Sequence, residues 1–293
     1  MGSTIMKLDK RELSLQTMYL KHGLLAFQTM YSQKTIDRWN HLLDPIFQSR
    51  KSEEPSYVQS NELLDLGILN EVISTKLLSA ITVLDPCPVL FQCHCMEIDW
   101  DHIVSNNYYS DFDGWHRGER DPNIKSVYGC RPFSIYIYLT DVKHTNDGAF
   151  EVIPGYETGP LESNLSCCNL TGRKGTCFLW NRDLYHRLNE HNSSVKQRIL
   201  KLSLQTNGWA NSRVQLDEFK RARTILNGIS PALSYLFGSH FNNNLSIKTI
   251  PFTRKGDLPQ LKPLDYSAKT EIPSKASIML RKFKNKVDQA LGF

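Results

Sequence analysis

The chain has 293 residues, of which 40% are hydrophobic and 10% aromatic. A chain of this length and composition can bury a sizeable apolar core, so a miniprotein held together by disulfides is excluded and a globular fold is expected. The net charge of +5 is small, and the basic tail from Lys275 onward nearly supplies it, so no nucleic-acid polymer is expected as a partner.

The first part of the chain, residues 1–85, is predicted to form a helical layer that packs on the rest. Helices are expected over residues 8–20, from about Lys34 after a cap at Ser32, and over residues 69–84, where Asp85-Pro86 ends the last one. A short apolar segment over residues 24–30 separates the first two helices.

Residues 86–206 have a different texture. Apolar stretches become short, rich in Val, Ile, Phe and Tyr, and separated by Gly, Pro and Asn. Few long helices interrupt them, which favours an antiparallel barrel or sandwich over a doubly wound parallel sheet. The predicted fold class is therefore mainly β with flanking helices, and strands are expected over residues 89–98, 107–115, 133–139, 149–153, 176–180 and 198–204.

Residues 207–293 are predicted to be a partly helical, basic C-terminal extension of what is one compact domain overall. A helix is expected over residues 216–226, and a basic amphipathic segment over residues 275–291 closes the chain. The expected role of this last segment is a solvated helix packed on the core, with an interaction arm for a partner as the alternative.

The sequence also predicts where the protein is located and whether its cysteines are reduced. The N-terminus lacks the roughly 7 to 15 apolar residues of a signal peptide, and no run of about 18 apolar residues occurs, so a cytoplasmic protein without a membrane segment is expected. The seven cysteines are irregularly spaced, which favours reduced thiols. A zinc site from residues 93–95 and 167–168 is the alternative, although a strand would place Cys93 and Cys95 on one face and His94 on the other.

Three islands within the β region hold residues that could carry chemistry. They are residues 115–120 (WHRGER), residues 136–155, and residues 175–186, which end at His186 and are followed by Arg198. Each histidine alone could be a hydrogen-bonded structural imidazole. The order and spacing of the three islands together are more specific.

Over about residues 89–205, these islands resemble the phytanoyl-CoA dioxygenase-like branch of the Fe(II)/2-oxoglutarate oxygenases. Residues 148–157 (GAFEVIPGYE) match the turn of that family that follows its first metal motif. The resemblance implies a double-stranded β-helix, a cupin-like jelly roll, in which His116 and His186 bind iron. It also implies that Arg198 binds the far carboxylate of 2-oxoglutarate, which suits a planar guanidinium that never loses its charge.

The sequence departs from the family at one position. Gly118 stands two residues after His116, where the family places the carboxylate of the 2-His-1-carboxylate site. A halide could take the vacated position, because it is anionic and glycine leaves room for it. The same replacement marks the Fe(II)/2-oxoglutarate halogenases, so the resemblance implies a chlorinase with Gly118 as the halide-binding, catalytic position.

Such an enzyme would use Fe(II), 2-oxoglutarate, chloride and O2 to halogenate an unactivated C–H bond. The substrate would be a small molecule, a nucleotide or a carrier-tethered group. Arg117 and Arg120 could attract an anionic substrate, or they could belong to a solvated loop. Tyr136 and Tyr138 share one face of a strand with Ser134, and one of the two tyrosines could donate a hydrogen bond to the keto acid.

Two further hypotheses stay open. A turn could bring Glu119 or Asp121 to the metal and preserve ordinary hydroxylation, although a regular strand would direct Glu119 to the face opposite His116. The barrel could also be a non-catalytic binding module, because fold does not imply function. Trp115 and Trp180 are more often core aromatics than walls of a ligand site.

Overall fold

The computed structural model describes residues 10–28, 30–50, 56–98, 132–154, 166–189, 196–206, 229–237, 258–262 and 268–269. The strand expected over residues 107–115, the helix expected over residues 216–226 and the basic segment over residues 275–291 lie outside these described residues.

Helices dominate the N-terminal part of the chain, as predicted. Among the described residues, no helix combines the length and apolar character needed to cross a bilayer. The described helices are α1 (Lys10–His22), α2 (Gln33–Ser49), α3 (Ser60–Asp65), α4 (Ile68–Val72), α5 (Thr75–Leu84) and, much later in the chain, α7 (Pro231–Phe237).

Serine caps set where two of these helices begin. The predicted cap of α2 is confirmed, because Ser32 Oγ accepts a hydrogen bond from the backbone N–H of Thr35 at 3.1 Å. The single helix predicted over residues 69–84 is wrong. Ser74 accepts from the backbone N–H of Leu77 at 3.2 Å and starts α5 as a separate helix after α4 ends.

The strands form two antiparallel sheets. In the described residues, the large sheet has the order β1-β7-β4-β9-β3-β2 and the small sheet the order β10-β6-β5-β8. The large sheet contains β1 (Leu24–Phe27), β2 (Ser56–Gln59), β3 (Pro88–Ile98), β4 (Phe133–Tyr138), β7 (Cys177–Asn181) and β9 (Gln197–Thr206). The small sheet contains β5 (Phe150–Val152), β6 (Ser166–Leu170), β8 (His186–Leu188) and β10 (Ala268–Lys269).

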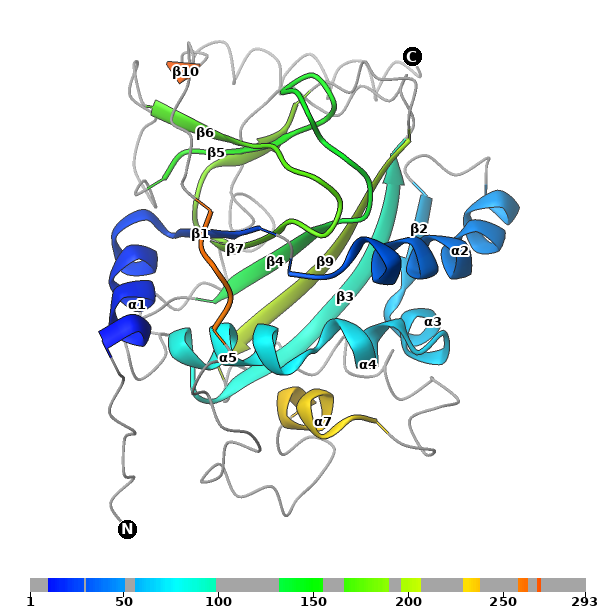
Figure 1. Ribbon diagram of the computed structural model, residues 1–293, viewed down its shortest axis with the longest axis horizontal. Helices are drawn as coiled ribbons and strands as arrows, with labels where there is room; N and C mark the ends of the chain where they lie inside the picture. The colour runs from blue at the N-terminus through cyan, green and yellow to red at the C-terminus, as the bar shows by residue number, and fades with distance from the viewer. Residues whose placement is uncertain are drawn as a thin grey trace, which may run out of the picture.

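The two sheets face each other, which is the double-stranded β-helix, or jelly roll, that the sequence predicts. The small sheet and helices α3 to α5 lie on opposite sides of the large sheet (Figure 1). The large sheet therefore has two covered faces, one toward the helices and one toward the small sheet.

Alternating side chains divide each long strand between these two faces. On β9, Leu200 and Leu202 join the core under the helices, whereas Ile199 joins the core between the sheets. On β3, Cys93 and Cys95 belong to the helix-side core, and the ring of His94 packs edge-on against Tyr57 beside the inter-sheet core. The separation of the two cysteines from His94 is confirmed.

A glycine is required in the turn that precedes β5. Gly148 has φ +76°, and a Cβ at this position would lie 2.4 Å from Gln197 Oε1. Gln197 Nε2 donates a hydrogen bond to the Gly148 carbonyl at 2.7 Å. A side chain at residue 148 would be strained by the backbone and would collide with the side chain that anchors this turn.

Candidate functional site

His186 follows a tight turn that connects β7 of the large sheet to β8 of the small sheet. The backbone N–H of Asn181, at the end of β7, donates to the Gly23 carbonyl at 2.7 Å, and that of Leu184 donates to the Asn181 carbonyl at 3.0 Å. The side chain of Asn181 accepts from the backbone N–H of Asp183 at 3.0 Å. The chain reverses within these few residues, and His186 becomes the first residue of β8.

The ring of His186 is fully buried and its tautomer is set. Its Nδ1 lies 2.9 Å from the carbonyl oxygen of Leu184. A carbonyl oxygen only accepts hydrogen bonds, so Nδ1 carries the proton, and in the neutral ring the lone pair is on Nε2. Histidines that bind a metal through Nε2 typically donate a hydrogen bond from Nδ1 to a group such as a backbone carbonyl, as His186 does here.

Aromatic rings surround this imidazole. The ring centroid of Trp180 lies 4.4 Å from that of His186, and the ring centroid of Phe150 lies 5.3 Å from it. Tyr136 joins them, with its ring centroid 4.6 Å from Phe150 and 5.5 Å from Trp180. These side chains come from β4, β5, β7 and β8, so both sheets contribute to one apolar wall.

Lys201 brings positive charge to this wall. Its Nζ lies 5.7 Å from the ring centroid of Tyr136 and 5.8 Å from that of Trp180. Tyr136 and Lys201 are direct neighbours across β4 and β9. The wall therefore combines a buried imidazole from the small sheet with an ammonium group from the large sheet.

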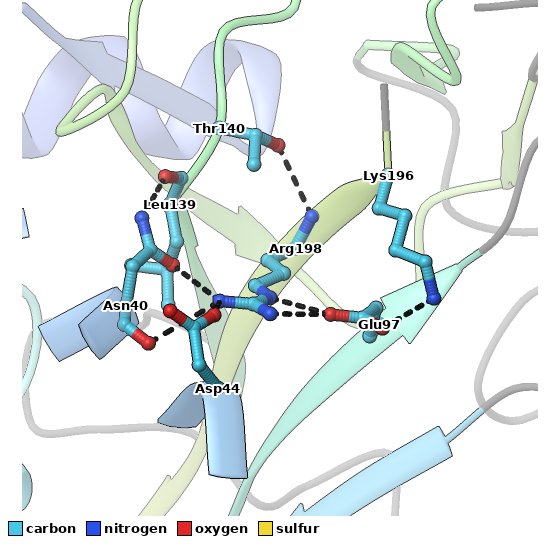
Figure 2. Close-up of polar contacts among 7 residues, drawn as sticks. All are labelled: Asn40, Asp44, Glu97, Leu139, Thr140, Lys196 and Arg198. Atoms are coloured by element: carbon cyan, nitrogen blue, oxygen red, sulfur yellow. Dashed lines mark hydrogen bonds and ion pairs between the residues drawn. The ribbon is translucent and has the colours of Figure 1, made fainter. Parts of the chain in front are cut away.

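Arg198 lies on the other face of the large sheet. Its Nε donates to Glu97 Oε2 at 2.6 Å, and its Nη1 lies 2.7 Å from Asp44 Oδ1. The guanidinium stacks over the ring of Phe47, 4.9 Å from the ring centroid, and also donates to the side-chain oxygen of Asn40 at 3.2 Å. Figure 2 shows Arg198 between Glu97 on one side and Asp44 and Asn40 of α2 on the other.

This placement does not support the role that the sequence suggested for Arg198. Burial alone would lower the pKa of Arg198, but its hydrogen bonds to Asp44 and Glu97 raise that pKa above the ordinary value. The side chain is 12% exposed, and two carboxylates already neutralise its charge. Arg198 joins α2 to β3 and β9, whereas Lys201, which the sequence analysis missed, faces the aromatic wall.

The two tyrosines proposed for the keto acid differ in their contacts. The Tyr138 hydroxyl donates to the Leu170 carbonyl at 2.7 Å and accepts from the backbone N–H of Phe150 at 3.0 Å. Burial raises the pKa of Tyr138 well above its usual range. Tyr138 therefore ties the two sheets together, and Tyr136 is the tyrosine next to Lys201. Ser134, on the same face, lies with its Oγ 3.3 Å from that of Ser203.

The other residues predicted at or near the metal site lie outside the described residues. They are His116, Gly118, Glu119, Asp121, Trp115, Arg117 and Arg120. Within the ranges that are described, no group of three His, Cys, Asp or Glu side chains could hold a metal ion.

The fold does not bring together the cysteines of the alternative zinc site. Cys93 and Cys95 lie in the large sheet under the helices, whereas Cys167 and Cys168 lie on β6 of the small sheet. The six cysteines in the described part of the chain are not paired in disulfides. Burial raises the pKa of Cys95 and of Cys177 well above the usual range, as is typical of structural cysteines.

Comparisons with known proteins agree with this architecture. No protein family's sequence profile matches the chain, and no curated protein sequence matches it. HygX from Streptomyces hygroscopicus, crystallised with nickel and 2-oxoglutarate, superposes with a TM-score of 0.54 at 13% identity over 69% of this chain and 89% of HygX.

Two further solved structures match to a similar extent. SnoK, a non-heme alpha-ketoglutarate-dependent carbocyclase from nogalamycin biosynthesis, has a TM-score of 0.53 at 12% identity over 68% of this chain and 85% of SnoK. The epimerase SnoN, with Fe3+, alpha-ketoglutarate and nogalamycin RO, has a TM-score of 0.51 at 12% identity over 67% of this chain and 84% of SnoN. At such identities the likeness establishes the fold.

Proposed function

We propose that the protein is a non-haem Fe(II)/2-oxoglutarate-dependent enzyme. The observation that carries the proposal is the pairing of His186 and Lys201 across the inter-sheet core. His186 is a buried imidazole with its lone pair on Nε2, and Lys201 places an ammonium group on the same aromatic wall. A metal ligand and a carboxylate-binding cation are what a chelated keto acid requires. The fold shared with HygX, SnoK and SnoN supports the same proposal.

The roles of the chain's own residues follow from this arrangement. His186 would bind iron through Nε2, with His116 as the second histidine, and the Leu184 carbonyl would hold the His186 ring in its ligating orientation. Lys201 would form an ion pair with the far carboxylate of 2-oxoglutarate, in place of Arg198. When bound, iron and 2-oxoglutarate would supply the oxidising power from O2 that breaks a substrate C–H bond. The wall around Trp180 would exclude water from that site.

Halogenation is our proposal for the outcome of the reaction. Gly118 offers no oxygen donor two residues after His116, so chloride could bind beside the metal in place of a carboxylate. The protein's own contribution would be to orient the substrate so that its C–H bond is halogenated and not hydroxylated. A small-molecule substrate is proposed, as SnoN is crystallised with nogalamycin RO, and a carrier-tethered substrate is the alternative.

The first experiment tests the cofactor set without knowing the substrate. Anaerobic protein is titrated with Fe(II) and 2-oxoglutarate, and the visible charge-transfer absorption of the chelated keto acid is recorded. A saturable band in wild type that is lost in His186→Ala supports the proposal. A wild-type protein without such a band would leave the barrel as a binding module.

The second experiment separates halogenation from hydroxylation. A crystal grown with Fe(II) and 2-oxoglutarate is soaked in bromide, and an anomalous peak bonded to the metal supports the halide position. Gly118→Asp should abolish that peak. If the peak is absent from wild type and metal affinity falls in Glu119→Gln or Asp121→Asn, the affected carboxylate is the third ligand and hydroxylation replaces halogenation as the proposed reaction.

A further inference from the structure

The indole N–H of Trp180 is a buried hydrogen-bond donor without an acceptor among the described residues. Trp180 has an exposed fraction of 0%, and within the part of the chain that the structure describes its Nε1 has no hydrogen-bond partner. An indole nitrogen can only donate, and leaving a buried donor unpaired is costly. The other tryptophan in the described residues, Trp39, shows the usual solution, because its Nε1 donates to Glu71 Oε2 at 2.8 Å.

The position of Trp180 indicates which kind of molecule supplies the acceptor. Its ring lies 4.4 Å from the ring of His186 on one side, and Lys201 Nζ lies 5.8 Å from its centroid on another. The indole therefore adjoins both groups that the proposed function assigns to the keto acid and its metal, His186 and Lys201. An acceptor attracted to Lys201 carries negative charge, and hydrogen bonds to charged acceptors are the stronger ones.

We propose that Trp180 is a binding residue for the keto acid: its indole N–H donates a hydrogen bond to an anionic oxygen of 2-oxoglutarate, next to the ion pair with Lys201. This inference rests on the proposed function, because it needs 2-oxoglutarate to occupy the wall between His186 and Lys201. It adds a second task for the same ring. Trp180 packs against the metal-binding imidazole and also contacts the keto acid, so one side chain positions both.

The test compares two conservative substitutions at buried tryptophans. Trp180→Phe keeps an aromatic ring beside His186 and removes only the donor and part of the volume. Trp39→Phe makes the same change on the helix side, where the donor has Glu71 as its partner. The dissociation constants of Mn(II) and of 2-oxoglutarate in the presence of Mn(II) are measured by calorimetry without O2, so that no turnover is needed.

Wild-type binding of 2-oxoglutarate comes first, and its absence would reject the proposed function itself. Given that binding, Trp180→Phe should weaken 2-oxoglutarate about tenfold or more, the effect of one hydrogen bond to a charged group. Affinity for Mn(II) alone should change less than about threefold, and Trp39→Phe should change neither constant. A folded Trp180→Phe that binds 2-oxoglutarate as tightly as wild type would overturn the inference and assign the indole N–H to a buried water.

A second measurement does not depend on a variant that folds. Wild-type protein with 15N-labelled indoles and diamagnetic Zn(II) is titrated with 2-oxoglutarate, and the indole N–H signals are followed by NMR. The Trp180 signal should move downfield as the hydrogen bond forms, whereas the Trp39 signal should stay in place. Triple-resonance assignment of 13C,15N-labelled protein identifies the Trp180 signal and separates it from that of Trp115, which precedes the proposed ligand His116. A Trp180 signal that does not move while 2-oxoglutarate binds would also overturn the inference.

Discussion

The two faces of the large sheet use positive charge in different ways. Arg198 and Lys201 stand on the same strand, β9, three residues apart. Arg198 faces the helices, where Glu97 and Asp44 neutralise it. Lys201 faces the small sheet and lies against the rings of Tyr136 and Trp180. A basic residue in a predicted strand is therefore informative about function only when its face of the sheet is known.

The largest effect is expected when the helix-side network is broken. Among the described residues, Arg198→Met leaves Glu97, which is 6% exposed, with only Lys196 as a cationic partner, 2.8 Å away. Removing one partner of a buried ion pair costs about 3 kcal/mol or more of unfolding free energy. Urea denaturation measures that loss, and calorimetry should find 2-oxoglutarate affinity in the folded variant within about twofold of wild type.

The double variant Arg198→Met/Glu97→Leu is the control for that result. It removes both charges, so it should recover part of the lost stability. If Arg198→Met weakens 2-oxoglutarate as much as Lys201→Met does, the functional contrast between the two faces fails and the keto acid belongs to Arg198.

The converse substitution tests the inner face of the large sheet, which is the face toward the small sheet. Lys201→Met keeps a long apolar side chain over Tyr136 and removes the charge. The lost charge-assisted contact should raise the dissociation constant of 2-oxoglutarate by about 30-fold, equivalent to roughly 2 kcal/mol. Unfolding free energy should change by less than about 1 kcal/mol. Lys201→Arg, which preserves the charge, should retain more affinity than Lys201→Met, and equal losses in both would argue against an ion pair.

This contrast also explains what could be predicted from the sequence. The apolar periodicity and the cap at Ser32 were sufficient for α2, and the alternating pattern was sufficient for the faces of Cys93 and His94. The metal-ligating role of His186 stays a prediction from the motif, and the structure places the residue at the start of β8.

Other features could not be predicted because they depend on tertiary context. Arg198 and Lys201 differ by an odd number of positions, so they must face opposite sides, but only packing decides which side is inside. The three-residue strand β8 is too short for a periodicity signal. The break between α4 and α5 depends on the Ser74 hydroxyl, which stands within an otherwise helical stretch.

The inner face also contributes to stability, and Tyr138→Phe measures how much. The substitution removes the hydroxyl that donates to the Leu170 carbonyl and accepts from the backbone N–H of Phe150. Two buried backbone groups would lose their partner, at a cost of about 2 kcal/mol of unfolding free energy. Affinity for 2-oxoglutarate should stay within about threefold in calorimetry. A tenfold loss would instead make Tyr138 part of the binding wall.

The smallest effect concerns an ion pair at the margin of the helix side. Burial alone would raise the pKa of Glu62, but hydrogen bonds from Arg50 and from the backbone N–H of Gln59 lower it below the ordinary value. A carboxyl group with a lowered pKa stabilises the fold fully above its unfolded pKa of roughly 4.3 and loses that contribution as pH falls through the folded value. Wild type should therefore lose more unfolding free energy than Glu62→Gln between pH 7 and pH 3, by about 1 kcal/mol because the pair is partly exposed.

Urea denaturation at the two pH values gives the difference, and 1 M salt should reduce it. Identical pH dependence in the two proteins would mean that Arg50 and Glu62 contribute nothing measurable, and that charge stabilises the helix side only where it is buried, as at Arg198.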